Sequence, residues 1–268
     1  YTTVLNSFGR LLGESDVLPE EMDSDLMVRY ETFLKARGIC PNSSSYYMRG
    51  LGAVYNRAVE KELTVQRNPF KHVYTGIDKT VKRAVPLKII RQIRDTDLTI
   101  TPATDYAHDL FMFSFYTRGM SFVDMAYLKK KDLQNGVLAY RRQKTGQQLF
   151  IKWEKPMQEI VEKYDTSGTP YLLPIIRDME KDARKQYKNA AHLVNAKLKK
   201  LGEQLGLGIP LTTSVAPLAW ASIARSKNIP VSTISKAMGN DSEITTRIYL
   251  TSLDTSVVDK ANSLILKS

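Results

Sequence analysis

Residues 210–254, PLTTSVAPLAWASIARSKNIPVSTISKAMGNDSEITTRIYLTSLD, carry the pattern from which the fold is predicted. The apolar run after Thr213 predicts a buried helix, and the sequence Asn-Ile-Pro at 228–230 predicts the turn that ends it. A second short helix is expected to end at Met238-Gly239, because glycine commonly follows the last turn of a helix. A polar turn and an aromatic segment then place Tyr249 shortly before a final amphipathic helix that begins at Asp254 or Thr255.

The composition is that of a globular protein with a polyanionic partner. The chain has 268 residues, of which 43% are hydrophobic, enough for one large core or two modest ones. It has no signal-peptide pattern and no apolar run near the roughly 18 residues of a membrane helix. Its net charge of +11 favours a polyanion, because cations that neutralise phosphates release counterions. One cysteine and three scattered histidines argue against a disulfide and a cysteine-based metal site, and they fit a reduced cytoplasm.

The chain is expected to form two domains. Residues 1–83 read as a helical DNA-binding module, with a basic linker from about residue 66 where prolines and a glycine interrupt any periodicity. The second domain is expected over residues 86–268. Before Gly38 only one helix is clear, opening at Asp23 or Ser24.

The positive charge is clustered. Residues 49–83 hold eight basic and three acidic residues, and residues 129–155 hold eight and two. In the first cluster, the sequence Asn-Ser-Ser-Ser at 42–45 is expected to cap a helix with an apolar stripe on one side and cations on the other. This pattern suits contact with DNA phosphates, and a solvated basic face explains it equally well. The cations predicted to contact DNA are Arg49, Arg57, Lys61, Lys82, Arg83, Arg141 and Arg142.

Two candidates for phosphate chemistry lie in the second domain. Arg118 follows a strongly apolar helix, where its charge is costly to bury unless it meets an anion; a structural pair with Asp124 is the alternative. Gly119 allows a break in the chain before Ser121 caps a short helix. Two β-patterned runs, 136–142 and 147–153, predict a hairpin with Lys144 at its tip, a place where a lysine is ordinarily only solvated.

These patterns together resemble the tyrosine recombinase (phage integrase) family. In that family the region typically reads H-x-x-R-H, then L-G-H, then T-T-x-x-Y, and here Gly239-Asn240 and Thr245-Thr246 precede Tyr249 at matching intervals. The segments FYTRGMSFVDMAYL and RRQKTGQQLFIKW look like integrases of Bacteroides-type mobile elements. The resemblance covers nearly the whole chain, and it implies that the N-terminal module is truncated, because a preceding helix and any arm-site domain are missing. It implies a mainly α fold of two domains, a small helical core-binding (SAM-like) domain and a mostly helical catalytic domain with a small β-sheet or hairpin.

The resemblance also implies roles for residues. Tyr249 corresponds to the nucleophile, Arg118 to the first catalytic arginine and Lys144 to the hairpin lysine. Four residues stand where the family usually has His, Arg, His and His or Trp, and we expect a degenerate site for that reason. In chain order they are Ser214, Pro217, Leu218 and Asn240.

The replacements suit a packed helix. Thr212, Thr213 or Ser214 is expected to cap it, Pro217 to fall in its first turn, and Leu218 to extend an apolar run. Under this interpretation a cationic pocket has become part of a core, and Tyr249 has the alternative role of a packed aromatic residue.

The expected reaction shows why these losses matter. A tyrosine oxygen that attacks a phosphodiester forms a pentavalent phosphorane with extra negative charge, which arginines stabilise while lysine and histidine move protons. Loss of one such donor typically costs on the order of 10² to 10³ in rate. We therefore expect cleavage through a 3′-phosphotyrosine, without metal or other cofactor, to be weak or absent.

Two functions follow as hypotheses. The first is a site-specific recombination and integration protein of a bacterial mobile element, which binds duplex DNA in the nucleoid and has an impaired cleavage site. The alternative is a non-catalytic DNA-binding accessory protein, or a relic or altered protein. As in the family, the final helix is expected either to dock on a second protomer on DNA or to fold back on its own chain.

Overall fold

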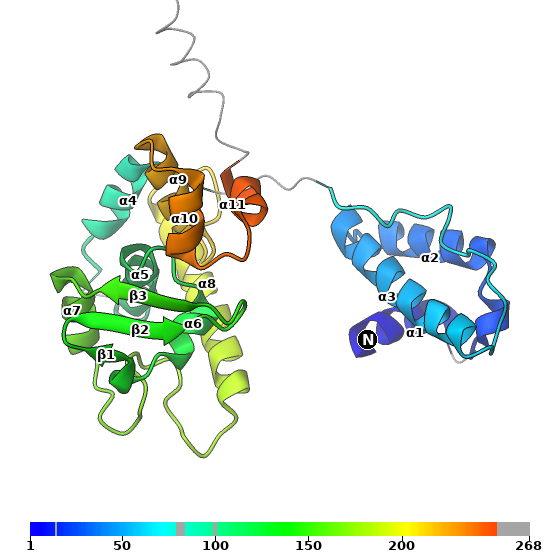
Figure 1. The fold of residues 1–268 in the computed structure, drawn as a ribbon, viewed down its shortest axis with the longest axis horizontal. Helices are drawn as coiled ribbons and strands as arrows, with labels where there is room; N and C mark the ends of the chain where they lie inside the picture. The colour runs from blue at the N-terminus through cyan, green and yellow to red at the C-terminus, as the bar shows by residue number, and fades with distance from the viewer. Residues whose placement is uncertain (14, 79–83, 99–100, 251–268) are drawn as a thin grey trace, which may run out of the picture. The chain divides into compact units, whose positions relative to one another are not determined.

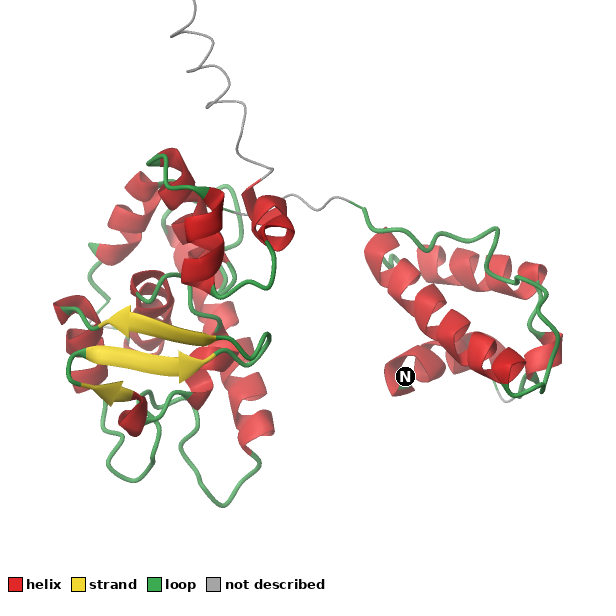
Figure 2. Ribbon diagram, viewed as in Figure 1, coloured by secondary structure: helices red, strands yellow, loops and turns green. Residues whose placement is uncertain are grey.

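Two compact units, Tyr1–Thr80 and Val81–Ser268, make up the chain (Figure 1). The computed structural model describes residues 1–13, 15–78, 84–98 and 101–250, apart from the side chains of Ile248 and Tyr249. Within these ranges the fold is mainly helical, and the strands belong to the second unit (Figure 2). The predicted fold class, mainly α with a small sheet, is confirmed. No described helix has the length and apolar character needed to cross a membrane.

The first unit is a helical bundle around one core. The side chain of Asp23 accepts a hydrogen bond from the backbone N–H of Leu26 at 2.7 Å, which confirms the predicted cap. The first helix was not predicted, although Val4 and Phe8 pack one turn apart into the core. The helices are α1 (Thr2–Leu12), α2 (Ser24–Ala36) and α3 (Pro41–Glu60), and a short 3₁₀ turn, η1, spans Pro19–Glu21.

The predicted cap of α3 is wrong. The helix begins at Pro41, whose missing N–H is tolerated in a first turn, and Cys40 is the N-cap residue. Asn42 instead forms two hydrogen bonds with the backbone of Asp78, and Ser45 donates one to the carbonyl of Gly76 at 2.5 Å. The polar cluster therefore holds a later segment of the chain against α3.

The segment that we expected to be a linker from about residue 66 is partly built into the first unit. The hydroxyl of Tyr55 accepts a hydrogen bond from the N–H of Arg67 and donates one to the carbonyl of Val65. The N–H of Tyr74 donates to Glu31 at 2.8 Å. Residues 66–78 are thus fixed on α2 and α3 by backbone hydrogen bonds, which the absence of sequence periodicity did not reveal.

The second unit surrounds a long apolar helix, α5, with helices on one side and a three-stranded sheet on the other (Figure 1). Its helices are α4 (Leu87–Arg94), α5 (Pro102–Tyr116), α6 (Phe122–Tyr127), α7 (Lys155–Glu162), α8 (Ala183–Gln204), α9 (Val215–Ser226), α10 (Val231–Met238) and α11 (Glu243–Leu250), with a 3₁₀ turn, η2, at Lys130–Asp132. Its antiparallel strands are β1 (Leu133–Gln134), β2 (Val137–Arg141) and β3 (Gln148–Lys152), in that order in the sheet.

The hairpin alternates as the sequence predicts. Leu138 pairs with Ile151 and Tyr140 with Leu149, and these four side chains form the buried face of the sheet. Because β2 and β3 are fixed by this face, the turn between them, residues 142–147, projects from a rigid base.

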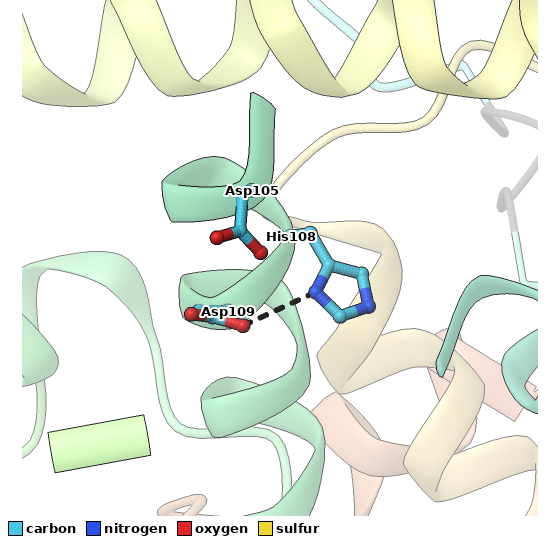
Figure 3. Close-up of side chains that lie close together, drawn as sticks. All are labelled: Asp105, His108 and Asp109. Carbon is cyan, nitrogen blue, oxygen red and sulfur yellow. Dashed lines mark hydrogen bonds and ion pairs between the residues drawn. The ribbon is translucent and has the colours of Figure 1, made fainter. Parts of the chain in front are cut away.

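A charged cluster that includes Asp105, His108 and Asp109 of α5 (Figure 3) ties this helix to the end of α7. Asp109, only 6% exposed, accepts hydrogen bonds from Lys163 at 2.8 Å and from the hydroxyl of Tyr164 at 2.7 Å. His108 Nδ1 lies 3.2 Å from the other Asp109 oxygen, and Lys163 also contacts Asp105 at 2.6 Å. Burial alone would raise the pKa of Asp109. Hydrogen bonds from His108, Lys163 and Tyr164 outweigh that effect and hold the pKa below its ordinary value.

A second constraint is the turn after α5, in which two consecutive residues have positive φ. Arg118 has φ +62° and Gly119 has φ +77°. A Cβ at Gly119 would lie 2.7 Å from the Cα of Pro217 in α9, so this turn packs backbone against backbone. Only glycine fits such an approach.

Replacing Asp109 with Asn is expected to destabilise the protein by about 1–3 kcal/mol near neutral pH, because a buried charged acceptor is lost. The folded-state pKa of Asp109 is lowered, so its contribution is present above the unfolded-state pKa of about 4 and is lost as the pH falls through the folded-state value. Urea unfolding of both proteins across that range measures the difference. Glu159→Gln, which breaks an exposed pair with Lys155, is the control and should change little. A pH-independent difference would contradict the assignment.

Gly119→Ala is expected to cost about 1–3 kcal/mol more than Gly136→Ala, because the new methyl group must displace Pro217. Gly136 has nearly the same φ, +73°, and nothing within 4 Å of its Cβ position, so it carries the conformational cost without the steric one. Equal losses of unfolding free energy in the two variants would show that the contact with α9 is not tight.

Candidate functional site

Arg118 lies in the turn between α5 and α6, half-buried, and its Nη1 donates a hydrogen bond to the carbonyl of Phe150 in β3 at 3.2 Å. The acidic partner that the sequence offered, Asp124, is engaged elsewhere. It accepts hydrogen bonds from the hydroxyl of Ser121 at 2.6 Å and from the N–H of Gln143 at 2.7 Å. Ser121 caps α6 as predicted. The remaining donors of Arg118 are therefore not committed to this carboxylate.

The first turn of α9 is next to Arg118, because Gly119 packs directly on Pro217. The two positions that the resemblance assigns to catalytic arginines, 118 and 217, are thus neighbours in the structure. Pro217 does fall in the first turn of α9, as predicted, and Leu218 is 8% exposed. Neither side chain has a hydrogen-bond donor, so this end of the site cannot bind a phosphate oxygen through them.

The predicted cap of α9 is only partly correct. Ser214 is the N-cap residue, but its side chain makes no hydrogen bond to the helix backbone and instead lies 2.9 Å from the hydroxyl of Thr212. The N–H of Thr213 donates to Asn195 of α8 at 2.8 Å. Ser214 is exposed, and its hydroxyl is the one polar group among the four replaced positions that faces solvent in the described structure.

Lys144 is exposed at the tip of the β2–β3 turn, where the sequence placed it. The turn is fastened to the segment that precedes α11: the hydroxyl of Thr145 donates to the carbonyl of Gly239 at 3.0 Å, and Gln147 Nε2 donates to the carbonyl of Asn240 at 3.3 Å. The structure therefore brings the Lys144 turn beside the start of the α11 region.

Arg142, which we expected to contact DNA, is turned inward, with 11% of its side chain exposed. Its Nη1 donates to the carbonyl of Gly239 and to Asn240 Oδ1, each at 2.7 Å, and its Nε lies 3.8 Å from Asp124 Oδ2. Asn240 Nδ2 in turn donates to the buried hydroxyl of Thr246 in α11 at 2.8 Å. Asn240 thus bonds inside the fold with both ends of its amide.

The other predicted DNA contacts are on the surface. Arg49, Arg57 and Lys61 are exposed along α3 and at its end, and Arg141 is exposed at the end of β2. Lys82 and Arg83 lie outside the described residues, as do Val257, Val258 and the rest of the expected final helix.

Tyr249 belongs to the last turn of α11, a helix where the sequence suggested only an aromatic segment. Its side chain lies outside the described part of the structure. α11 packs on α9 and α10 through a small core that includes Ala221, Ile234 and Leu250.

Sequence reasoning missed the inward network of Asp124, Arg142 and Thr246. One available signal was the spacing of Ser121 and Asp124, typical of a reciprocal cap at a helix start. Tyr140 is buried, and burial raises its pKa well above the ordinary value; the Asp124 charge adds to the rise, and Arg142 and Arg118 oppose it. The phenol of Tyr140 is therefore neutral.

Among the described residues, only Asp105, His108 and Asp109 bring three possible metal ligands together, within 4.8 Å. Lys163 already contacts both carboxylates. Because a lysine supplies the positive charge that a metal ion would bring, the cluster is explained as an ion-pair network between helices.

The first unit matches a family model by sequence: residues 1–81 match the phage integrase SAM-like domain. No curated protein sequence matches the chain.

Structures with the same fold extend the similarity to both units. A lambda integrase (75–356) dimer bound to a COC′ core site has a TM-score of 0.72 and 13% identity, over 95% of this chain and 88% of that one. The Tn1549 transposon integrase (residues 82–397) in complex with circular intermediate DNA has a TM-score of 0.64 and 14% identity, over 97% and 93%. XerA recombinase has a TM-score of 0.51 and 16% identity, over 98% and 88%.

At these identities the structural similarity establishes the fold, and the sequence match of residues 1–81 adds the family of the first unit. The second unit presents an arginine turn, a lysine turn and a late helix with a tyrosine in the order that the sequence predicted. The chain thus carries a phage integrase SAM-like domain over residues 1–81, and both of its units share the fold of the lambda and Tn1549 integrases.

Proposed function

We propose that this protein binds duplex DNA at a recombination site and acts in site-specific recombination or integration of a bacterial mobile element. The observations that support this most are two contacts: the Arg118 turn packs on the start of α9 at Gly119 and Pro217, and the Lys144 turn bonds through Thr145 to Gly239, shortly before α11. The net charge of +11 and the exposed cations of α3 supply the electrostatic attraction that DNA binding requires. Action on chromosomal DNA would place the protein in the cytoplasm, at the nucleoid.

Relatives of the same fold support DNA as the partner. Lambda integrase has been observed as a dimer on a core site and as a tetramer on a Holliday junction. By analogy this protein would assemble as a homo-oligomer on DNA, with the segment after α11 as the expected contact between protomers.

Strand cleavage would use Tyr249, Arg118 and Lys144. The phenol oxygen of Tyr249 attacks the phosphorus and gives up its proton to water, the bond to the 5′ oxygen breaks, and Lys144 protonates that oxygen as it leaves. Arg118 donates to a non-bridging oxygen of the phosphorane. The covalent product is a 3′-phosphotyrosine, and neither a metal nor another cofactor is required for these steps.

Three of the replaced positions argue for slow cleavage. Pro217 and Leu218 have no donors, and Asn240 is committed to Arg142 and Thr246. The alternative, a protein that binds the site without cutting, is favoured by the same observation. Ser214 remains as an exposed hydroxyl at the start of α9, and a hydroxyl does not exchange protons near neutral pH as the histidine that it replaces would.

Binding to duplex DNA is expected to weaken with salt, because each phosphate contact contributes about 0.9 to the slope of log K against log salt. Arg57→Gln should lower both affinity and slope. Arg29→Gln, an exposed arginine on α2, is the matched control and should leave both unchanged. Fluorescence anisotropy across a salt series gives both quantities. Absence of binding at low salt, or equal effects of the two variants, would contradict the proposal.

Cleavage is tested with a nicked duplex that traps the covalent intermediate. We expect a slow, Tyr249-dependent adduct on a denaturing gel, and none with Tyr249→Phe, which retains the ring but lacks the nucleophilic oxygen. Duplex binding without any adduct from the unaltered protein would favour the binding-only alternative. An adduct that persists in Tyr249→Phe would show that another residue is the nucleophile.

A further inference from the structure

The contacts of Arg142 join two parts of the proposed site that are far apart in sequence. One part is the β2–β3 turn with Lys144 at its tip, and the other is the turn between α10 and α11. We propose that Arg142 and Asn240 form a clasp that positions α11, and with it Tyr249, against the Lys144 turn. The contacts themselves are observed in the structure. Their effect on DNA cleavage rests on the proposed function.

Arg142 is held from both sides. Its Nη1 reaches two acceptors in the α10–α11 turn at 2.7 Å each, and its Nε faces Asp124 at 3.8 Å. The Asp124 side chain is 1% exposed and is itself fixed by Ser121 and by the N–H of Gln143. A guanidinium presents its donors in a rigid plane, so these partners fix its orientation as well as its place.

Asn240 transmits the contact to α11. Its Oδ1 accepts from Arg142, and its Nδ2 donates to Thr246, which is completely buried and lies one helical turn before Tyr249. The task needs an acceptor and a donor on one short side chain, which an amide supplies. Asn240 is therefore more than a lost phosphate ligand, because its amide links Arg142 to Thr246.

The turn is shaped for the clasp. Gly239 ends α10 with φ +63°, and a Cβ there would lie 2.9 Å from Leu149 Cδ1 and 3.3 Å from Arg142 Cδ. The absence of a side chain lets the carbonyl of Gly239 approach both Arg142 and Thr145. The carbonyl of Gly239 thus accepts hydrogen bonds from both Arg142 and Thr145, and a side chain at position 239 would prevent this approach.

The test is amide hydrogen exchange of residues 243–250 in the free, full-length protein, which does not depend on DNA binding or cleavage. Arg142→Gln and Thr246→Val should each speed exchange in α11 by about tenfold or more, because a hydrogen bond within a charged, buried network is lost. Exchange in α5 should stay as in the unaltered protein, which separates local release of α11 from general destabilisation.

Matched variants sharpen the result. Arg141→Gln removes the neighbouring arginine, whose contact to Gly146 lies within its own turn, and should leave α11 exchange unchanged. Arg142→Lys keeps the charge but cannot present two fixed donors, so it should rescue only in part. Asn240→Leu, which has neither an acceptor nor a donor, should behave like Arg142→Gln.

Unchanged α11 exchange in both Arg142→Gln and Thr246→Val would overturn the clasp. So would equal effects of Arg141→Gln and Arg142→Gln, or loss of protection in α5 to the same degree as in α11. If the unaltered protein fails to bind duplex DNA while these exchange results hold, the proposed function fails and the clasp stands as a feature of the fold.

Discussion

The arrangement of α10 and α11 on the sheet depends on the hydrogen bonds and the ion pair of the largely buried Arg142 guanidinium. A charge with 11% of its side chain exposed is tolerated only when it is paired and hydrogen-bonded, and Asp124 with the α10–α11 turn meets that need. Asp124 belongs to α6 and the other acceptors to the turn between α10 and α11, whereas Arg142 itself belongs to the hairpin. The ion pair and its hydrogen bonds therefore decide how α10 and α11 sit on the sheet.

The start of α9 holds Pro217 and Leu218, two of the positions where the resemblance leads us to expect catalytic residues. Pro217 meets the backbone of Gly119 and Leu218 is buried, so the start of α9 is joined to the Arg118 turn by van der Waals contact. A pair of arginines in the same place would repel each other unless a phosphate lay between them. In this chain the two elements are held together without an anion, which favours stability of the free protein over stabilisation of a transition state.

The sequence was informative wherever a local rule decides the structure. Asp23 precedes a clear helical pattern and caps it, Gly239 ends α10, and the alternation from Leu138 to Ile151 gives the hairpin and its buried face. These outcomes depend on neighbours in the chain, so one sequence is enough to predict them. The family resemblance supplied the rest of the architecture.

The errors arose where distant contacts decide. Arg141 and Arg142 are adjacent and identical in type, and only the tertiary structure determines that one faces solvent and the other Asp124. Asn42 has the sequence of a cap but bonds to Asp78, since Pro41 already begins α3. Asn240 was assigned a loss of function from its position alone, and its contacts with Arg142 and Thr246 could not be read from spacing.

The most direct measurement of the central claim is a double-mutant cycle on unfolding free energy with Arg142→Gln and Thr246→Val. The two side chains share Asn240 as their partner, which is the only link between them in the described network. If Asn240 transmits the position of the hairpin to α11, the second substitution should cost less once the first is present, with a coupling energy above about 0.5 kcal/mol. Additive losses would show that Arg142 and α11 are independent, and would contradict the account.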